Sequence, residues 1–226
     1  MQPYLFPHIA YFQLMRAVDI FVIYDDVNFI KNGWINRNRI TVDGRERLFT
    51  LPIEKKSSYT LIKDTKIFDG KMSKKQLLRL IQFAYRKAPQ FDDVMTLLEN
   101  VILFEADYLS AYIEYGIRQI LAYLNFQTEI ILSSDIQKRS TLRGTEKVLE
   151  ICNILHATEY VNAIGGTSLY EKKDFDSNKI KLHFLRTGDV CYEQFNGFIP
   201  NLSIIDVLMF NPLSEVRKFS TNFCLL

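Results

Sequence analysis

Short apolar runs alternate with amphipathic segments along nearly the whole chain, and this alternation restricts the fold more than any other feature. Ile20–Asp25 is a continuous apolar run that ends in acid, as buried parallel strands do. Between residues 73 and 125, apolar residues recur at spacings of three and four, which predicts a layer of helices. Strands that alternate with helices indicate an α/β protein with a mixed, partly parallel sheet flanked by helices.

The remaining elements follow from the same patterns and from turn residues. Asp43-Gly44 predicts a hairpin turn between two strands. We expect strands at residues 34–42, 47–52, 60–68, 129–132, 159–162 and 179–185, and helices at residues 9–18, 145–155 and 202–209. We divide the chain into an N-terminal α/β region with the helical layer (residues 1–130) and a C-terminal α/β region packed on it (residues 131–226), forming one compact unit.

Charge and composition restrict the partners. The net charge is +2, so the chain lacks the basic surplus that neutralises nucleic-acid phosphates. No apolar run reaches the roughly 18 residues of a membrane span, and the N-terminus lacks the basic start of a signal peptide. The three Cys fit neither a disulfide framework nor a zinc site. We therefore expect a cytoplasmic protein with a small-molecule partner and no metal, while the sequence specifies no cofactor and leaves a homodimer open.

The N-terminal segment carries the most informative residues. Pro3 and Pro7 stiffen a loop rich in polar and aromatic side chains, and a predicted helix follows at once. The N-terminal end of such a helix favours an anion. An equally weighted interpretation is that the loop only clamps the sheet. The side chains that we expect to contact a substrate from this segment are Gln2, Tyr4, His8 and Tyr11.

Acidic residues end the first strand. Asp25 and Asp26 would lie at its carboxyl end, where open α/β sheets keep their ligand groups. One of them could act as a base or bind a substrate hydroxyl, and the alternative is that they cap the following loop.

Cations surround the only Trp of the chain. Lys31, Arg37 and Arg39 could hold a phosphate or carboxylate beside Trp34. In a strand, Arg37 and Arg39 would share one face, and Asn36 and Asn38 would share the other and could also contact a substrate. The alternative is an edge strand blunted by charge.

Four motifs in this region resemble the WbqC-like family. They are Gln-Pro-Tyr-x-Phe-Pro from Gln2, Tyr-Phe-Gln-Leu from Tyr11, Asp-x-Phe-Val-x-x-Asp-Asp-Val from Asp19, and Lys-x-x-Trp-x-x-Arg-Asn-Arg-Ile from Lys31. The resemblance continues towards the C-terminus through Tyr192–Gln194 and Leu202–Asp206. The chain departs from it at His8 and Ala10, where Tyr and Gly are more usual, and members usually carry a short apolar strand before the first motif.

The resemblance implies a biosynthetic pathway and leaves the reaction mechanism open. It implies a transferase of surface-polysaccharide assembly, such as that of O-antigen. We interpret the reaction as transfer of a small acyl or aminoacyl group onto an activated sugar, with a nucleotide sugar or an acyl donor as substrate. In that interpretation Asp25, Asp26, Lys31 and Arg37 are catalytic, and Gly165, Gly166, Tyr192 and Gln194 help to close the substrate site.

Two alternatives stay open. The chain carries no unambiguous catalytic signature, which leaves a non-catalytic binding or scaffold protein in the same pathway. Residues 6–11 also faintly resemble the first loop of nucleotidylyl transferases, and Lys71–Lys74 resembles the start of their second signature. Only His8 matches the first of those motifs, and the second falls too early in the chain.

Overall fold

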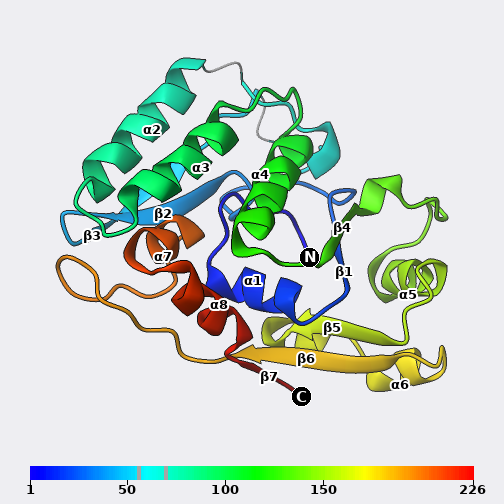
Figure 1. Cartoon of the computed structure of the whole chain (residues 1–226). Helices are drawn as coiled ribbons and strands as arrows, with labels where there is room; N and C mark the ends of the chain where they lie inside the picture. The colour runs from blue at the N-terminus through cyan, green and yellow to red at the C-terminus, as the bar shows by residue number, and fades with distance from the viewer. Residues whose placement is uncertain (55–56, 69–70) are drawn as a thin grey trace.

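The structure is a computed structural model that describes residues 1–54, 57–68 and 71–226 (Figure 1). It confirms the α/β class with parallel and antiparallel pairing and with helices around the strands. The strands belong to three small sheets instead of one.

The central sheet is a parallel pair. β1 (Ile20–Ile23) pairs with β4 (Glu129–Leu132), with Phe21 opposite Ile130. Phe21 and Ile23 of β1 are buried in the core, while Ile20 and Val22 are partly exposed, so one face of the strand packs more tightly than the other. Met1 lies along the other edge of β1, because its nitrogen donates to Val22 O (2.9 Å) and its carbonyl accepts from Tyr24 N (2.8 Å). This pattern of bonds is that of a parallel ladder.

The predicted hairpin forms the second sheet. β2 (Arg37–Val42) pairs antiparallel with β3 (Arg45–Thr50). The turn residues Asp43 and Gly44 have φ of +50° and +72°, as a two-residue hairpin turn requires. We expected the first strand from residue 34, but residues 34–36 form a bend.

The third sheet contains β5 (Glu159–Ala163), β6 (Lys181–Thr187) and β7 (Phe223–Leu225) in that order. β5 and β6 are parallel, and the short helix α6 (Lys172–Asp176) lies in the connection between them. β7 pairs antiparallel with β6 and was not predicted, because it is only three residues long.

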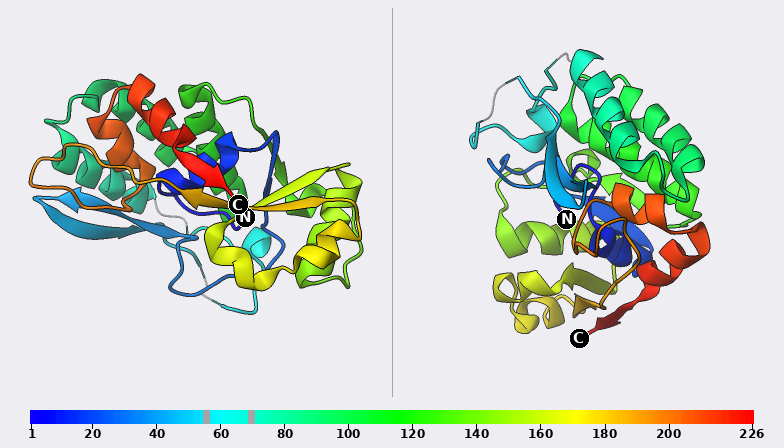
Figure 2. Two further views of the ribbon diagram at one scale, coloured as in Figure 1. Left: turned by 90° about the horizontal axis from the view of Figure 1, so that it is seen from below. Right: turned by 90° about the vertical axis from the view of Figure 1, so that its left-hand side faces the viewer.

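The helical layer expected around residues 73–125 is present. It consists of α2 (Lys71–Tyr85), α3 (Phe91–Leu103) and α4 (Leu109–Leu124). Figure 2 shows these helices on one side of the β2–β3 hairpin, while the third sheet and α6 lie in a separate part of the molecule.

The expected strand at residues 60–68 is wrong. A 3₁₀ turn, η1 (Ile62–Asp64), occupies its centre, and only isolated bridges flank it. The reason is that this segment bonds to the loop after β1, through Ile62 N to Val27 O (2.9 Å) and Lys63 N to Asp25 O (2.9 Å). Two more 3₁₀ turns follow strands, η2 (Ser133–Asp135) and η3 (Ile164–Leu169).

The contact between α1 and α8 brings the N-terminal and C-terminal parts of the chain together. α1 (Ile9–Arg16) packs on α8 (Leu213–Thr221), and the Gln13 amide donates to Phe219 O (2.8 Å) and Asn222 O (3.0 Å) at the end of α8. α7 (Ile204–Phe210) precedes α8, and α5 (Gly144–Ile154) follows β4.

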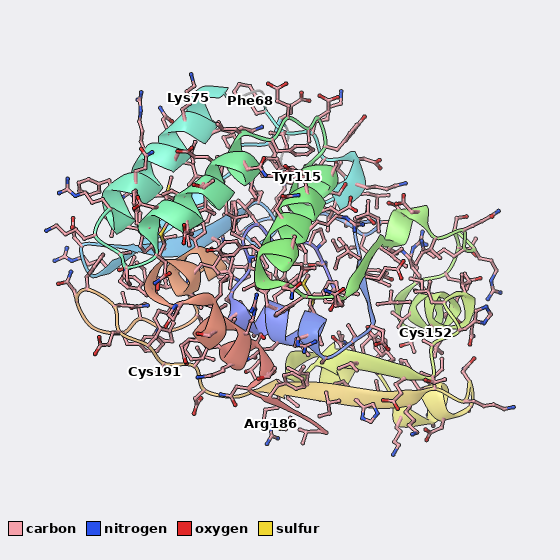
Figure 3. All side chains as sticks on the ribbon, viewed as in Figure 1. Phe68, Lys75, Tyr115, Cys152, Arg186 and Cys191 are labelled. Carbon is pink, nitrogen blue, oxygen red and sulfur yellow. The ribbon has the colours of Figure 1, made fainter. Side chains whose placement is uncertain are left out.

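One large hydrophobic core extends from Leu5 to Val216, and a smaller cluster contains Val148, Cys152, Phe175 and Ile180. The three thiols are free, with Cys152 buried at α5 and Cys191 exposed in the loop after β6 (Figure 3). The division at residue 130 remains a prediction.

Candidate functional site

The N-terminal loop is held in place by side chains from distant segments. The Asn38 amide donates to Leu5 O (2.9 Å) and Phe6 O (2.8 Å), and the Ser203 hydroxyl also donates to Phe6 O (2.8 Å). Phe6 has a φ of +44°, a left-handed conformation that is uncommon for a bulky residue. Such strained conformations persist where the surroundings fix them, and they cluster at functional sites.

A hollow of about 150 Å³ opens beside this loop. It lies between the loop, the bend and first strand of the hairpin, and the segment that leads into α7. Its walls are Tyr4, Pro7, His8, Trp34, Asn38, Arg39 and Asn201. The structure therefore brings together four of the predicted site residues, Tyr4, His8, Trp34 and Asn38.

His8 is the N-cap of α1. Its Nδ1 accepts from Ala10 N (3.3 Å), so this nitrogen carries no proton. Burial, and then the positive charge of Arg39, lower the pKa of His8 below its usual range. The imidazole is therefore neutral at physiological pH, and its proton is on Nε2.

Arg39 forms the charged wall of the hollow. Its Nη1 pairs with Glu46 (2.8 Å), its Nη2 donates to Asn201 O (3.4 Å), and its guanidinium lies 5.1 Å from the centre of the Trp34 ring. The Nε atom is buried and has no hydrogen-bond partner among the described residues. The parts of the guanidinium that face the hollow are therefore its Nη groups, each of which carries a second N–H besides the one used by Glu46 or Asn201.

Tyr4 and Tyr11 pack together at the start of the chain, with ring centres 5.7 Å apart. Burial raises the pKa of Tyr4. The Tyr11 hydroxyl donates to Gln2 O (2.9 Å) and Tyr11 is buried, so Tyr11 supports the loop and Gln2 contributes its main chain to this bond. Neither Gln2 nor Tyr11 lines the hollow.

Asp25 and Asp26 lie at the carboxyl end of β1, as predicted, but neither lines the hollow. Asp25 is fully buried and accepts from Ser134 N (3.0 Å) and Ser134 Oγ (2.7 Å). Burial raises the pKa of Asp25 and outweighs the bonds from Ser134. For Asp26, burial also opposes the charge, but hydrogen bonds from Lys138 and Lys147 outweigh it and lower the pKa.

The two lysines beside Asp26 are almost completely engaged. Lys138 Nζ lies 2.8 Å from Asp26 Oδ2 and donates to Ser133 O and Ile136 O. Lys147 Nζ lies 2.8 Å from Asp26 Oδ1, donates to Asp26 O (3.0 Å) and sits 4.6 Å from the centre of the Tyr24 ring. Each ammonium has three donors, so these contacts leave little for a ligand.

The other cations predicted near Trp34 lie outside the hollow. Lys31 is exposed. Arg37 donates from Nε to Gly33 O (2.9 Å) and from Nη2 to Asn32 O, so it shapes the bend that carries Trp34. Asn36 is buried and donates to Leu51 O (2.9 Å), which ties the bend to the end of β3.

Tyr192 and Gln194 bind a carboxylate that the sequence did not indicate as a site residue. Asp206, on α7, is fully buried and accepts from Tyr85 (2.6 Å), Tyr192 (2.7 Å) and Gln194 (2.7 Å). Burial raises the pKa of Asp206, against the effect of these three bonds. Gln194 also exchanges hydrogen bonds with the main chain of Ile199, so these side chains fix the loop before α7.

Gly165 and Gly166 belong to η3, and neither lines the hollow. A Cβ atom on Gly166 would lie 2.6 Å from the Asn162 amide nitrogen, so a side chain there would require the Asn162 side chain to move. Gly166 therefore packs closely against a side chain of β5.

Sequence reasoning indicated one of the two further polar walls of the hollow and missed the other. It placed Arg39 on the same strand face as Arg37, as a cation that could hold an anion, without including it among the site residues. Asn201 has a φ of +58° and comes from a segment 162 residues after Arg39, as their bond shows. No local signal places it at this site.

Two further classes of feature are absent from the described part of the chain. Within residues 1–54, 57–68 and 71–226, no group of three or more His, Cys, Asp or Glu side chains is placed to hold a metal ion. None of the helices in those ranges has both the length and the apolar character that a membrane span requires.

The fold and the hollow together define an α/β protein with a small polar site under its N-terminal loop. The WbqC-like protein family matches residues 2–218, and the chain belongs to that family. It is 32% identical over 217 residues to the uncharacterized protein Rv1507c of Mycobacterium tuberculosis, which covers 94% of this chain and 92% of that protein. No solved structure matches the chain.

Proposed function

We propose that this protein is a transferase of surface-polysaccharide assembly that moves a small acyl or aminoacyl group onto an activated sugar. The carbonyl of the transferred group lies in the hollow. The observation that carries the proposal is that His8, neutral and with its proton on Nε2, lines the same hollow as the Arg39 guanidinium. Two preorganised donors at one place stabilise negative charge that develops on an oxygen.

The roles of these groups follow from the chemistry of acyl transfer. A hydroxyl or amine of the sugar attacks the acyl carbon, and the carbonyl oxygen becomes negative. His8 Nε2–H and the Arg39 guanidinium donate to this oxygen. The carbonyl then reforms as the bond to the leaving group breaks, the leaving group keeps the electron pair, and the proton of the acceptor passes to it.

The size of the hollow determines which part of the substrates enters it. Sites for drug-sized ligands have volumes of roughly 300–1,000 Å³, whereas this hollow has about 150 Å³. Only the reacting group fits inside, so the sugar lies across the rim. Trp34 is 38% exposed there and offers a flat apolar face on which a sugar ring can stack.

The small volume also favours a second candidate function. A non-catalytic protein of the same pathway could use the hollow to recognise one end of a sugar or of a partner's side chain. The engagement of Asp25 and Asp26 with Ser134, Lys138 and Lys147 favours this candidate as well, because it leaves no obvious base beside the hollow.

A transfer assay separates the two candidates. The protein is incubated with acyl thioesters or aminoacyl donors and with nucleotide sugars, and the sugar is examined by mass spectrometry for the added mass. We expect transfer by the natural sequence and a loss of about 100-fold in Arg39→Gln, the size of effect seen when an oxyanion donor is removed.

Arg47→Gln is the matched control, because it removes the same charge from the exposed neighbouring strand β3. It should leave transfer unchanged. Transfer that survives in Arg39→Gln would place the chemistry elsewhere. If no donor is used and a protein partner copurifies, the binding candidate replaces the transferase.

A further inference from the structure

We infer that the hollow selects the carboxylate of a small organic acid, the free form of an acyl group, and rejects amines and phosphate dianions. This inference rests on the proposed function and narrows it, because it names the end of the transferred group that enters the protein.

The first step is the inventory of hydrogen-bonding groups. His8, with its proton on Nε2, and the Arg39 guanidinium both line the hollow, and these two groups can only donate. The Tyr4 hydroxyl can donate as well. A wall made of donors is complementary to a ligand that brings acceptor oxygens.

The second step is that the wall offers a cation no counter-charge. The Asn38 oxygen already accepts from Arg39 N (2.8 Å), and the Asn201 main-chain carbonyl accepts from Arg39 Nη2. Among the described residues, no carboxylate lines the hollow. An ammonium group would therefore lose its hydration beside the positive charge of Arg39 without gaining a counter-ion, which is costly. An aminoacyl group can enter only with its amine directed outward.

The third step is the charge. Among the described residues, Arg39 is the only cationic side chain of the wall, and its charge is partly balanced by Glu46. His8 adds none, because burial and Arg39 lower its pKa. One partly neutralised cation balances a monoanion, whereas a phosphate dianion would remain undercompensated in a confined site.

The fourth step is the shape. The guanidinium lies 5.1 Å from the centre of the Trp34 ring, and the N–H groups of Nη1 and Nη2 that Glu46 and Asn201 leave unused lie in one plane, which suits a planar carboxylate. The volume of about 150 Å³ has room for a short chain of carbon atoms beside the carboxylate.

The test is binding without turnover. Propionate, inorganic phosphate and ethylamine are titrated into the full chain at neutral pH, and binding is followed by ligand-observed NMR and by the fluorescence of Trp34, the only Trp. We expect saturable binding of propionate, and binding of phosphate and ethylamine at least tenfold weaker.

Variants then locate the site. Arg39→Gln should lower the affinity for propionate at least tenfold. Arg39→Lys should lower the affinity less, since Lys keeps the charge but not the planar guanidinium. Arg47→Gln should leave it unchanged, and circular dichroism verifies that each variant is folded. The inference is overturned if phosphate binds as tightly as propionate, if propionate fails to saturate, or if Arg39→Gln leaves its affinity unchanged.

The two proposals can fail separately. Acyl transfer by a protein that does not bind propionate at this site would leave the proposed function intact and remove the inference. Propionate binding that depends on Arg39, without transfer from any donor, would keep the inference and favour the non-catalytic candidate.

Discussion

The Asp26 carboxylate lies 2.8 Å from the Lys147 ammonium, so the carboxyl end of β1 is tied to α5, 121 residues further along the chain. Lys138 completes this buried ion cluster from the other side of the carboxylate. The lysine side chains are 7% exposed and that of Asp26 is 14% exposed, so little solvent screens the charges. We therefore expect this cluster to act on stability.

Asp26→Asn should destabilise the protein by about 3 kcal/mol, because it leaves two buried ammonium groups without a counter-ion. Urea unfolding followed by circular dichroism measures the change. Asp135→Asn, an exposed acid in η2, is the control and should cost less than about 0.5 kcal/mol. Equal losses in the two variants would contradict the buried-cluster interpretation.

The Asp26 carboxylate should also make the free energy of unfolding depend on pH. The pKa of Asp26 is lowered in the folded protein, so its contribution is complete above the unfolded value of 3.8 and is lost as the pH falls through the folded pKa. The stability difference between the natural sequence and Asp26→Asn should therefore shrink on acidification to about pH 3. Urea unfolding curves of both proteins between pH 7 and about pH 3 test this prediction. A stability difference that grows towards low pH would contradict it.

His8 should have two separable roles, in the cap of α1 and in the hollow. His8→Ala removes the acceptor for Ala10 N and should cost about 1 kcal/mol, whereas His8→Ser restores a capping oxygen and most of that stability. Both variants lose the Nε2 donor and should lose transfer alike. If Ser restores transfer together with stability, the imidazole serves only as a cap.

Tyr192→Phe tests whether Tyr192 supports the fold or contacts a ligand. Its hydroxyl donates to buried Asp206, so the variant should lose about 1.5–3 kcal/mol of stability, the range for a bond to a charged group. Tyr115→Phe is the matched control, since the Tyr115 hydroxyl bonds to Asn100 at the exposed surface. Loss of transfer at unchanged stability would instead favour the predicted substrate contact.

Asn38→Ala should loosen the N-terminal loop. The substitution leaves Leu5 O without a donor and Phe6 O with Ser203 alone, at a cost of about 1–3 kcal/mol. Hydrogen exchange at the Leu5 amide, which donates to Trp34 O, should become faster than in Asn100→Ala, where an exposed amide is removed. Unchanged exchange would show that packing alone holds the loop.

Much of the fold could be predicted from local patterns. Continuous apolar runs identified β1 and β4, spacings of three and four identified α2–α4, and Asp43-Gly44 identified the hairpin. The incorrect secondary-structure predictions fall where tertiary contacts determine the local conformation. Residues 60–68 bond to the loop after β1 instead of forming a strand, and β7 depends on pairing with β6.

The site could be predicted only in part. The motifs pointed to Tyr4, His8, Trp34 and Asn38, which share the hollow. The sequence could not distinguish the charges that face this hollow from those that pair within the protein. Asp26 and Arg37 look as available as Arg39 in the sequence, because their partners Lys147 and Gly33 are identified only by the folded chain.

The segments that build the hollow lie far apart in the sequence. Phe6 and Pro7 receive their bonds from Ser203 and Ile204, and Arg39 meets Asn201. During translation residues 4–39 leave the ribosome long before these partners are made, and contacts of such high sequence separation form slowly. The binding site therefore stays incomplete until the segment at residues 201–204 has been synthesised, and a chain that stops before this segment lacks the Asn201 wall and the bonds that hold the N-terminal loop.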